Sequence, residues 1–168
     1  MELTDIMPVE GWNRLAEDIY THFGFNGAVY DRNNNVIVKS EGWANKICPL
    51  IKGGDSRIIC ASAQQSCSTE AKETKETVIV ECDAGLIKFI VPIFVNNEFV
   101  GSIGGCGCLL ENSEMDTFYL SKLLKKDDIK DFLKSIERIS QEKLTEAVKY
   151  VQLHIQDALK NKGILVRR

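Results

Sequence analysis

The stretch of residues 81–110 limits the fold of this chain more than any other part of the sequence. Two short apolar runs rich in β-branched residues, Ile87–Val95 and residues 99–103, flank a polar break. Runs of this kind with turn residues between them predict a strand hairpin. The outer ends of a hairpin lie side by side, so Cys82 comes near Cys106, although 24 residues separate them. The sequence therefore predicts that distant cysteines converge at one end of a sheet.

The remaining chain alternates between strand and helix patterns. Apolar spacing and turn residues predict strands over 25–30, 36–38 and 78–80, besides the hairpin. Helices are expected over 8–23, 43–52 and 55–72, after Ser113, after Asp127 or Asp128, and from Ser140 to about residue 160. This order predicts an α+β fold with a central antiparallel five-stranded sheet and flanking helices, in a PAS-like or GAF-like architecture.

The composition is that of an ordinary globular domain with an unusual number of cysteines. The 168 residues carry a net charge of −3, which favours neither nucleic acid nor an anionic membrane as a partner. No signal peptide and no apolar run of membrane-spanning length are found, so we expect a cytoplasmic protein with reduced thiols. Six cysteines then indicate buried thiols, a metal site or redox chemistry rather than disulfides.

Geometry narrows the six cysteines to one preferred set. Cys60 and Cys67 are seven apart on a predicted helix, or about 10 Å along its axis, and Cys106 and Cys108 lie about 6.6 Å apart on one face of a regular strand. Thiolates that share a zinc ion lie within about 4 Å of each other, so neither pair can share one, and the roles of Cys67 and Cys108 stay open. One cysteine from each element suits zinc or a 4Fe–4S cluster, and these candidate ligands are Cys48, Cys60, Cys82 and Cys106. The alternative is that scattered cysteines are buried small hydrophobic residues.

Two residues beside these cysteines are candidates for contact with a bound cofactor, namely Asp83 and Gly105. Asp83 could equally be a turn residue at the end of a strand. Gly105 belongs to a glycine-rich segment that has no helix after it, which indicates close backbone approach or a bulge rather than a phosphate loop. Its glycines could also bend the strand between Cys106 and Cys108.

Several segments resemble the PocR sensory domain over roughly residues 8–136: those at 47–51, 57–65, 81–86, 91–101 and 104–107. The resemblance implies a PAS-like fold, small organic ligands such as diols, and output to transcription factors, histidine kinases or chemoreceptors. It places Cys48, Cys60 and Cys82 on recurrent cysteines of the family. Many relatives have His at the position of Asp83 and Gln at that of Cys106. The presence of Cys106 in place of Gln adds a fourth cysteine to the three recurrent ones. It also weakens the inference that this chain binds a diol as its relatives do.

We therefore divide the chain into a PocR-like sensory domain, residues 1–136, and a C-terminal helix with a basic tail, residues 137–168, that serves signalling, dimerisation or packing. The predicted function is a cytosolic sensor that holds an iron–sulfur cluster, zinc or a small organic ligand and relays its state to a signalling protein. A metal-free thiol redox sensor and a diol-binding domain with structural cysteines are the alternatives, and a homodimer is left open. An enzyme is not expected, because neither His22 nor His154 is near a cysteine in sequence and no nucleotide-binding motif is present.

Overall fold

The computed structural model describes residues 1–126 and 129–164, and its centre is an antiparallel sheet. The strand order is β2-β1-β5-β4-β3. The bounds are β1 Asn26–Asp31, β2 Val36–Lys39, β3 Val78–Glu81, β4 Ile87–Val95 and β5 Glu98–Leu110. The predicted α+β fold with five antiparallel strands is confirmed. A sixth strand, β6 (Arg138–Ile139), pairs in parallel with the end of β5 and was not predicted, because two residues carry no periodicity.

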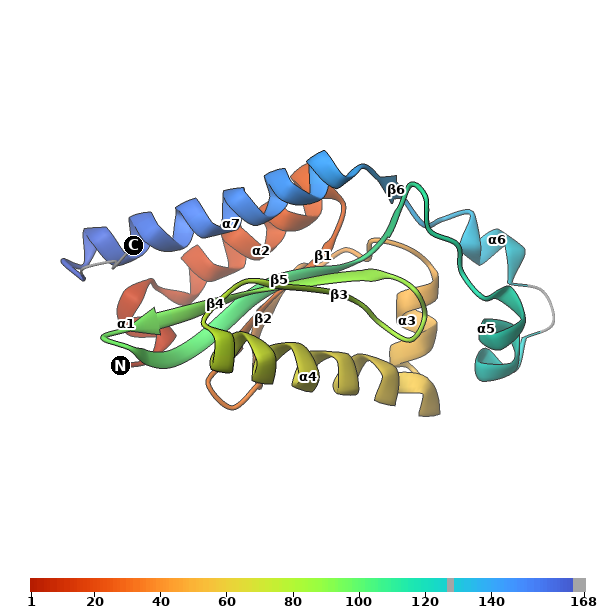
Figure 1. Ribbon diagram of the computed structural model, residues 1–168, viewed down its shortest axis with the longest axis horizontal. Coiled ribbons are helices and arrows are strands. Elements are labelled where there is room, and N and C mark those ends of the chain that lie inside the picture. The colour runs from red at the N-terminus through yellow and green to blue at the C-terminus, as the bar shows by residue number, and fades with distance from the viewer. Residues whose placement is uncertain (127–128, 165–168) are drawn as a thin grey trace.

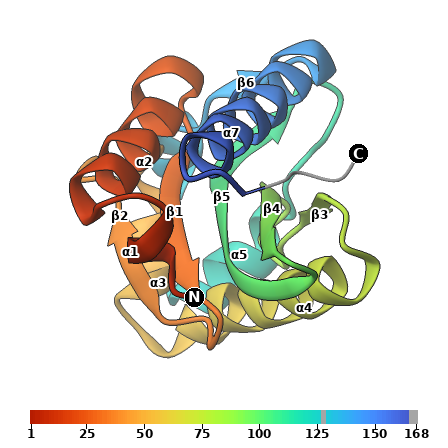
Figure 2. The same cartoon turned by 90° about the vertical axis from the view of Figure 1, so that its left-hand side faces the viewer.

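Helices cover both faces of the sheet (Figures 1 and 2). One face carries α2 (Val9–Phe23) and α7 (Gln141–Asn161), and the other carries α3 (Ile47–Lys52) and α4 (Ile58–Thr74). The remaining helical segments are α1 Leu3–Ile6, the 3₁₀ turn η1 Asp55–Arg57, α5 Thr117–Leu124 and α6 Lys130–Leu133. This three-layer arrangement is consistent with the expected PAS-like or GAF-like architecture.

Helix α7 packs back onto its own domain. Its predicted apolar stripe is buried in the main core together with α2 and the sheet, and includes Leu144, Val151 and Ile155. The Tyr150 hydroxyl also donates to the Asp18 carboxylate on α2, at 2.8 Å. Residues 137–161 therefore contribute to the same core as the strands and α2.

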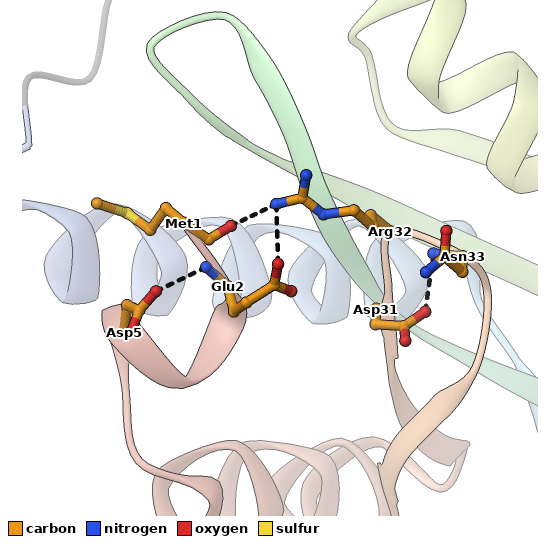
Figure 3. A network of polar contacts seen from close by, with 6 residues as sticks. All are labelled: Met1, Glu2, Asp5, Asp31, Arg32 and Asn33. Atoms are coloured by element: carbon orange, nitrogen blue, oxygen red, sulfur yellow. Dashed lines mark hydrogen bonds and ion pairs between the residues drawn. The ribbon is translucent and has the colours of Figure 1, made fainter.

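The unpredicted helix α1 is held beside the turn between β1 and β2 (Figure 3). The Arg32 guanidinium forms an ion pair of 3.2 Å with Glu2 and donates to the Met1 carbonyl. A surface ion pair of this kind contributes about 0 to 1 kcal/mol. The buried Leu3 side chain, and the 2.9 Å hydrogen bond from Trp12 Nε1 to the Leu3 carbonyl, are therefore the stronger anchors of α1.

Several helix starts differ from the prediction by a few residues. Asp116, and not Ser113, caps α5, because its carboxylate accepts from the Tyr119 backbone amide at 2.8 Å. Asp55 begins the turn η1, and α4 follows it at Ile58. The predicted caps at positions 127 and 128 lie outside the described residues.

Strand β5 crosses the centre of the sheet with its backbone unusually close to β4. A Cβ atom on Gly104 would lie 2.1 Å from the Phe89 carbonyl oxygen, so only glycine fits there. Farther along, Cys106 pairs with Lys88 and Cys108 pairs with Ile87, which leaves Gly107 as the extra residue of a β-bulge. Gly107 adopts a φ of +105°, which is a conformation that side chains rarely allow.

We predict that Gly104→Ala lowers the free energy of unfolding by about 3 kcal/mol, because the new methyl group forces two paired backbones apart. Gly54→Ala is the matched control, since its Cβ would have no atom closer than 3.9 Å, and we expect a change of less than about 1 kcal/mol there. Urea denaturation followed by circular dichroism measures both values. Equal stability of the two variants would contradict close β4–β5 contact.

Candidate functional site

The bulge at Gly107 directs Cys106 and Cys108 to opposite faces of the sheet. Cys106 lies on the α3 and α4 side, next to Asn26. Cys108 is buried in the core beneath α2 and α7, where its thiol donates to the Gly24 carbonyl at 3.3 Å. The expectation for a regular strand, with both thiols on one face, is therefore wrong. The inserted residue reverses the alternation of side chains.

The four cysteines of the preferred set occupy one region on the α3 and α4 side. Cys48, Cys60 and Cys82 pack in one apolar cluster at the end of the sheet. The negative charge of Cys106 raises the pKa of each of these three thiols, after the larger effect of burial. The charges of Cys60 and Cys82 also raise the pKa of Cys48, and that of Cys82 raises the pKa of Cys60. All six pairs within the set are thus electrostatically coupled.

The other two cysteines belong to different packing environments. Cys67 shares the buried face of α4 with Cys60, as the sequence predicted, but it packs under β3 and β4 with Val78 and Ile90. Cys108 lies on the far face of the sheet. Cys67 and Cys108 therefore pack in surroundings different from those of Cys48, Cys60 and Cys82.

Asn45 holds Cys48 in position. Its side-chain oxygen accepts from the backbone amides of Ile47 and Cys48 at 2.8 and 2.7 Å, which caps the first turn of α3. Its amide donates to the Gly107 carbonyl at 2.7 Å and to Cys48 Sγ at 3.3 Å. One buried side chain therefore links α3, the bulge of β5 and a thiol.

Asn26 plays a similar part for Cys106. Its oxygen accepts from the Ala44 amide at 2.6 Å, and its amide nitrogen lies 3.9 Å from Cys106 Sγ. Amide groups directed at sulfur stabilise thiolates and tune the metal centres that thiolates bind. Sequence reasoning missed both asparagines; the one available signal was the position of Asn45 three residues before Cys48, which suits a helix cap.

Burial raises the pKa of three of these thiols, Cys48, Cys60 and Cys82. It raises the pKa of Cys48 to about 12, although the Asn45 amide acts in the opposite direction. Burial is also the largest cause of the raised pKa of Cys60 and of Cys82. In Cys82 the backbone amides of Leu86 and Ala84 offset part of this effect.

Lys88 is the second group that sequence reasoning missed. It pairs with Cys106 across the sheet and is 7 % exposed, and its ammonium lies 5.8 Å from the centre of the Tyr30 ring. Burial lowers the pKa of Lys88, but the acidic groups of Tyr30, Cys106 and Cys67 raise it more, so the pKa ends above its usual value. No ion pair joins Lys88 to a carboxylate within the described part of the chain. The only sequence signal was a lysine inside an apolar strand.

The two predicted cofactor contacts have different surroundings. Asp83 is exposed in the turn that follows β3, directly after Cys82. Gly105 faces α2, where a Cβ atom would lie 2.8 Å from both Phe25 and Phe89. Gly105 therefore faces the side of the sheet opposite to Cys106.

The thiol region contains no assembled metal centre. In residues 1–126 and 129–164, no group of three or more His, Cys, Asp or Glu side chains is placed to hold a metal ion. Two surface grooves lie elsewhere, one on the outer face of α4 and one between the β4–β5 turn and α7, and the second has a volume of about 860 Å³. Among the described helices, none is long and apolar enough to cross a membrane.

Comparison with known proteins identifies the family. Residues 5–162 match the family model of the sensory domain found in PocR. No curated protein matches the chain. Because the match covers nearly all of the chain, this protein belongs to the PocR sensory domain family. The match extends through the whole of α7.

We predict that Asn45→Ala lowers the free energy of unfolding by about 2 kcal/mol or more, because it removes a helix cap and leaves the buried Gly107 carbonyl without its donor. Asn33→Ala is the control, since Asn33 is exposed, and a change below about 0.5 kcal/mol is expected there. Urea unfolding monitored by tryptophan fluorescence compares the two. A similarly small effect at Asn45 would show that this side chain does not hold α3 on β5.

Proposed function

We propose that this PocR sensory domain senses its signal through a metal centre held by Cys48, Cys60, Cys82 and Cys106. The observation that carries the proposal is the packing of Cys48, Cys60 and Cys82 in one cluster, on the side of the sheet to which Cys106 also points. A donor set made of cysteines alone suits zinc or an iron–sulfur cluster. Such a centre supplies redox or oxygen sensitivity when it is a cluster, and structural rigidity when it is zinc.

We place a 4Fe–4S cluster ahead of zinc as the occupant. One zinc ion requires sulfur atoms within about 4 Å of one another, and among the described residues no three such side chains are placed to hold a metal ion. A cubane cluster has four metal atoms and accepts ligands that are farther apart.

The charge balance around the site supports the same proposal. A cluster with four thiolates is an anion, and an anion is unfavourable in a buried site without compensation. Lys88 supplies a buried positive charge beside Cys106, and the amides of Asn26 and Asn45 supply N–H donors toward sulfur. Both features stabilise thiolates rather than neutral thiols.

The state of the site would reach a partner protein through the sheet. Strand β5 carries Cys106 on one face and contacts the layer of α2 and α7 through its other face. Loss or oxidation of the centre would shift the population between two arrangements of α3 and α4 on the sheet. A signalling partner would recognise this change, either at the helices or along α7.

Raised thiol pKa values argue against the competing roles of these cysteines. A nucleophilic enzyme and a metal-free redox switch both require a reactive thiolate at neutral pH. Burial instead holds Cys48, Cys60 and Cys82 in the protonated form. A bound metal overcomes this by displacing the protons.

The experiment is anaerobic purification followed by metal and sulfide analysis and a visible spectrum. We expect a brown protein with broad absorption near roughly 400 nm and about four iron and four sulfide per chain. Cys82→Ser should lose most of the iron, whereas Cys67→Ser and Cys108→Ser, the matched controls, should retain it. Stoichiometric zinc without iron would support a metal site at these cysteines but show that zinc, and not a cluster, occupies it. Protein without either metal would disprove the proposal.

A further inference from the structure

One edge of the central sheet is left open along half of β4. Strand β4 spans Ile87–Val95, but β3 pairs with it only between Ile87 and Ile90. Residues 91–95 therefore have β5 on one side and no strand of the described chain on the other. An open edge of this kind presents unpaired backbone groups, which can pair with another extended chain.

The turn after β4 shows which backbone groups are unpaired. Its residues 96–97 have φ angles of +49° and +72°, as in a two-residue type I′ hairpin, and Val95 pairs with Glu98 across it. The pair that flanks such a turn is hydrogen-bonded, so Val95 directs its N–H and C=O toward β5. Directions alternate along a strand, and the extra residue of the nearby bulge lies in β5 rather than in β4. The Phe94 N–H and the carbonyls of Phe94 and Pro92 therefore point to the open edge.

The groove between the β4–β5 turn and α7, with its volume of about 860 Å³, lies at this edge. Val91 lines it from one face of β4, and Pro92 and Phe94 line it from the other face. A groove that touches both faces of a strand lies at the edge of that strand. Within the described chain, no backbone group from outside the strands bonds to Pro92 or Phe94. The open space is therefore where a strand in line with β3 would continue the sheet.

The walls of the groove are held by contacts between distant parts of the chain. The Gln152 amide of α7 donates to the Thr77 hydroxyl at 3.0 Å, and the Lys75 ammonium donates to the Asn97 side-chain oxygen at 2.6 Å. The segment before β3 is thereby fixed to α7 and to the β4–β5 turn, which lies between α7 and α4 (Figure 2). Because these groups border the edge, a single extended chain reaches it more readily than the similarly bordered edge of a folded second copy.

We propose that this groove binds an extended, uncharged segment of a partner protein, which adds a strand beside residues 91–95 of β4. The segment donates backbone N–H groups to the carbonyls of Pro92 and Phe94 and accepts from the Phe94 N–H. In this mode of peptide recognition the backbone hydrogen bonds give affinity and alternate side chains give specificity. None of the residues that line the groove is a cysteine, so the proposal goes beyond the metal centre and does not depend on it.

The chemistry of the lining determines the class of segment. Its two charged side chains, Lys75 and Glu76, have opposite signs, so the groove does not favour a charged segment. The other polar groups are mostly carboxamides, which both donate and accept hydrogen bonds, as a peptide backbone does. One of them, Gln156, lines the groove from α7 and would bond to the outer backbone groups of the added strand. Val91 and Ile155, each 5 % exposed, favour an apolar side chain of the segment on the α7 side.

Nuclear magnetic resonance of the isotope-labelled protein tests the site. In the free protein we expect the Phe94 amide to exchange with solvent at least about tenfold faster than the Val91 amide, which points to β5. The probes are capped pentapeptides Thr-Xaa-Thr-Xaa-Thr in which Xaa is Val, Ile, Leu or Phe. At least one of them should shift the amide resonances of the groove saturably and slow the exchange at Phe94. Its analogue with N-methyl groups on the three central residues keeps the side chains but loses the N–H donors, and should bind at least about tenfold more weakly.

Variants assign the binding to the open edge. Gln156→Ala, which removes a carboxamide from the α7 wall, should weaken binding about fivefold, as the loss of one hydrogen bond predicts. Gln141→Ala is the matched control, because it makes the same change on the same helix at an exposed position about 22 Å away along the axis, and it should bind like the wild type. Phe94→Pro removes the outward N–H and should abolish binding. If Phe94→Pro does not fold, Gln156→Ala decides the result.

Three outcomes would overturn the proposal: no saturable shift with any of the peptides, equal binding of the N-methylated analogue, or exchange at Phe94 as slow as at Val91 in the free protein. Slower exchange at Phe94 with rising protein concentration, together with a dimer in sedimentation equilibrium, would assign the edge to a second copy instead. Cys82→Ser should bind the peptide like the wild type, so that a failure of the metal centre and a failure of this site are distinguished.

Discussion

The close contact between the backbones of β5 and β4 is the constraint on which the rest of this structure depends. Strand β5 lies at the centre of the sheet, and at Gly104 no side chain fits against the Phe89 carbonyl. On the α4 side of the sheet, Gly104 pairs with Ile90, which is fully buried with Cys67 and Ala71. Lys88, which pairs with Cys106 two residues farther along β5, places its ammonium 5.8 Å from the centre of the Tyr30 ring. This face of the sheet therefore combines an apolar cluster with a buried lysine.

The bulge at Gly107 then determines which cysteines meet. In a regular strand Cys106 and Cys108 would share a face, and one would compete with the other for the same partners. The extra residue directs Cys108 into the α2 and α7 core and leaves Cys106 with Cys48, Cys60 and Cys82. The Gly107 carbonyl, exposed by the same distortion, accepts from Asn45 and so fixes α3. Bulges are known to redirect side chains near functional sites, and here one residue both separates the thiols and anchors the loop that carries Cys48.

The sequence predicted those parts of the molecule that depend on periodicity. The five strands, the long helices and the approach of Cys82 to Cys106 follow from alternating or helical apolar spacing and from the hairpin turn. Helix α1 and strand β6 are too short to show a period, and their positions depend on tertiary contacts such as that between Trp12 and the Leu3 carbonyl. Asn26, Asn45 and Lys88 could not be found from spacing, because each acts through partners that are distant in sequence. The sequence pattern also did not predict which face of the sheet Gly105 lies on, because this depends on the register of β5 with its neighbours.

The buried polar groups of this domain lower its stability, and their positions indicate where a bound group would act. Buried thiols and unpartnered polar atoms lower the stability of the free protein, because each gives up hydration without a full replacement. On the other face of the sheet, the apolar contacts of α2 and α7 supply the compensating burial. A domain divided in this way has one rigid layer and one layer whose packing improves when a bound group satisfies it. Ligand-dependent population shift requires such a difference in free energy between states. The asymmetry of the two layers is therefore the physical property that suits this sheet to sensing.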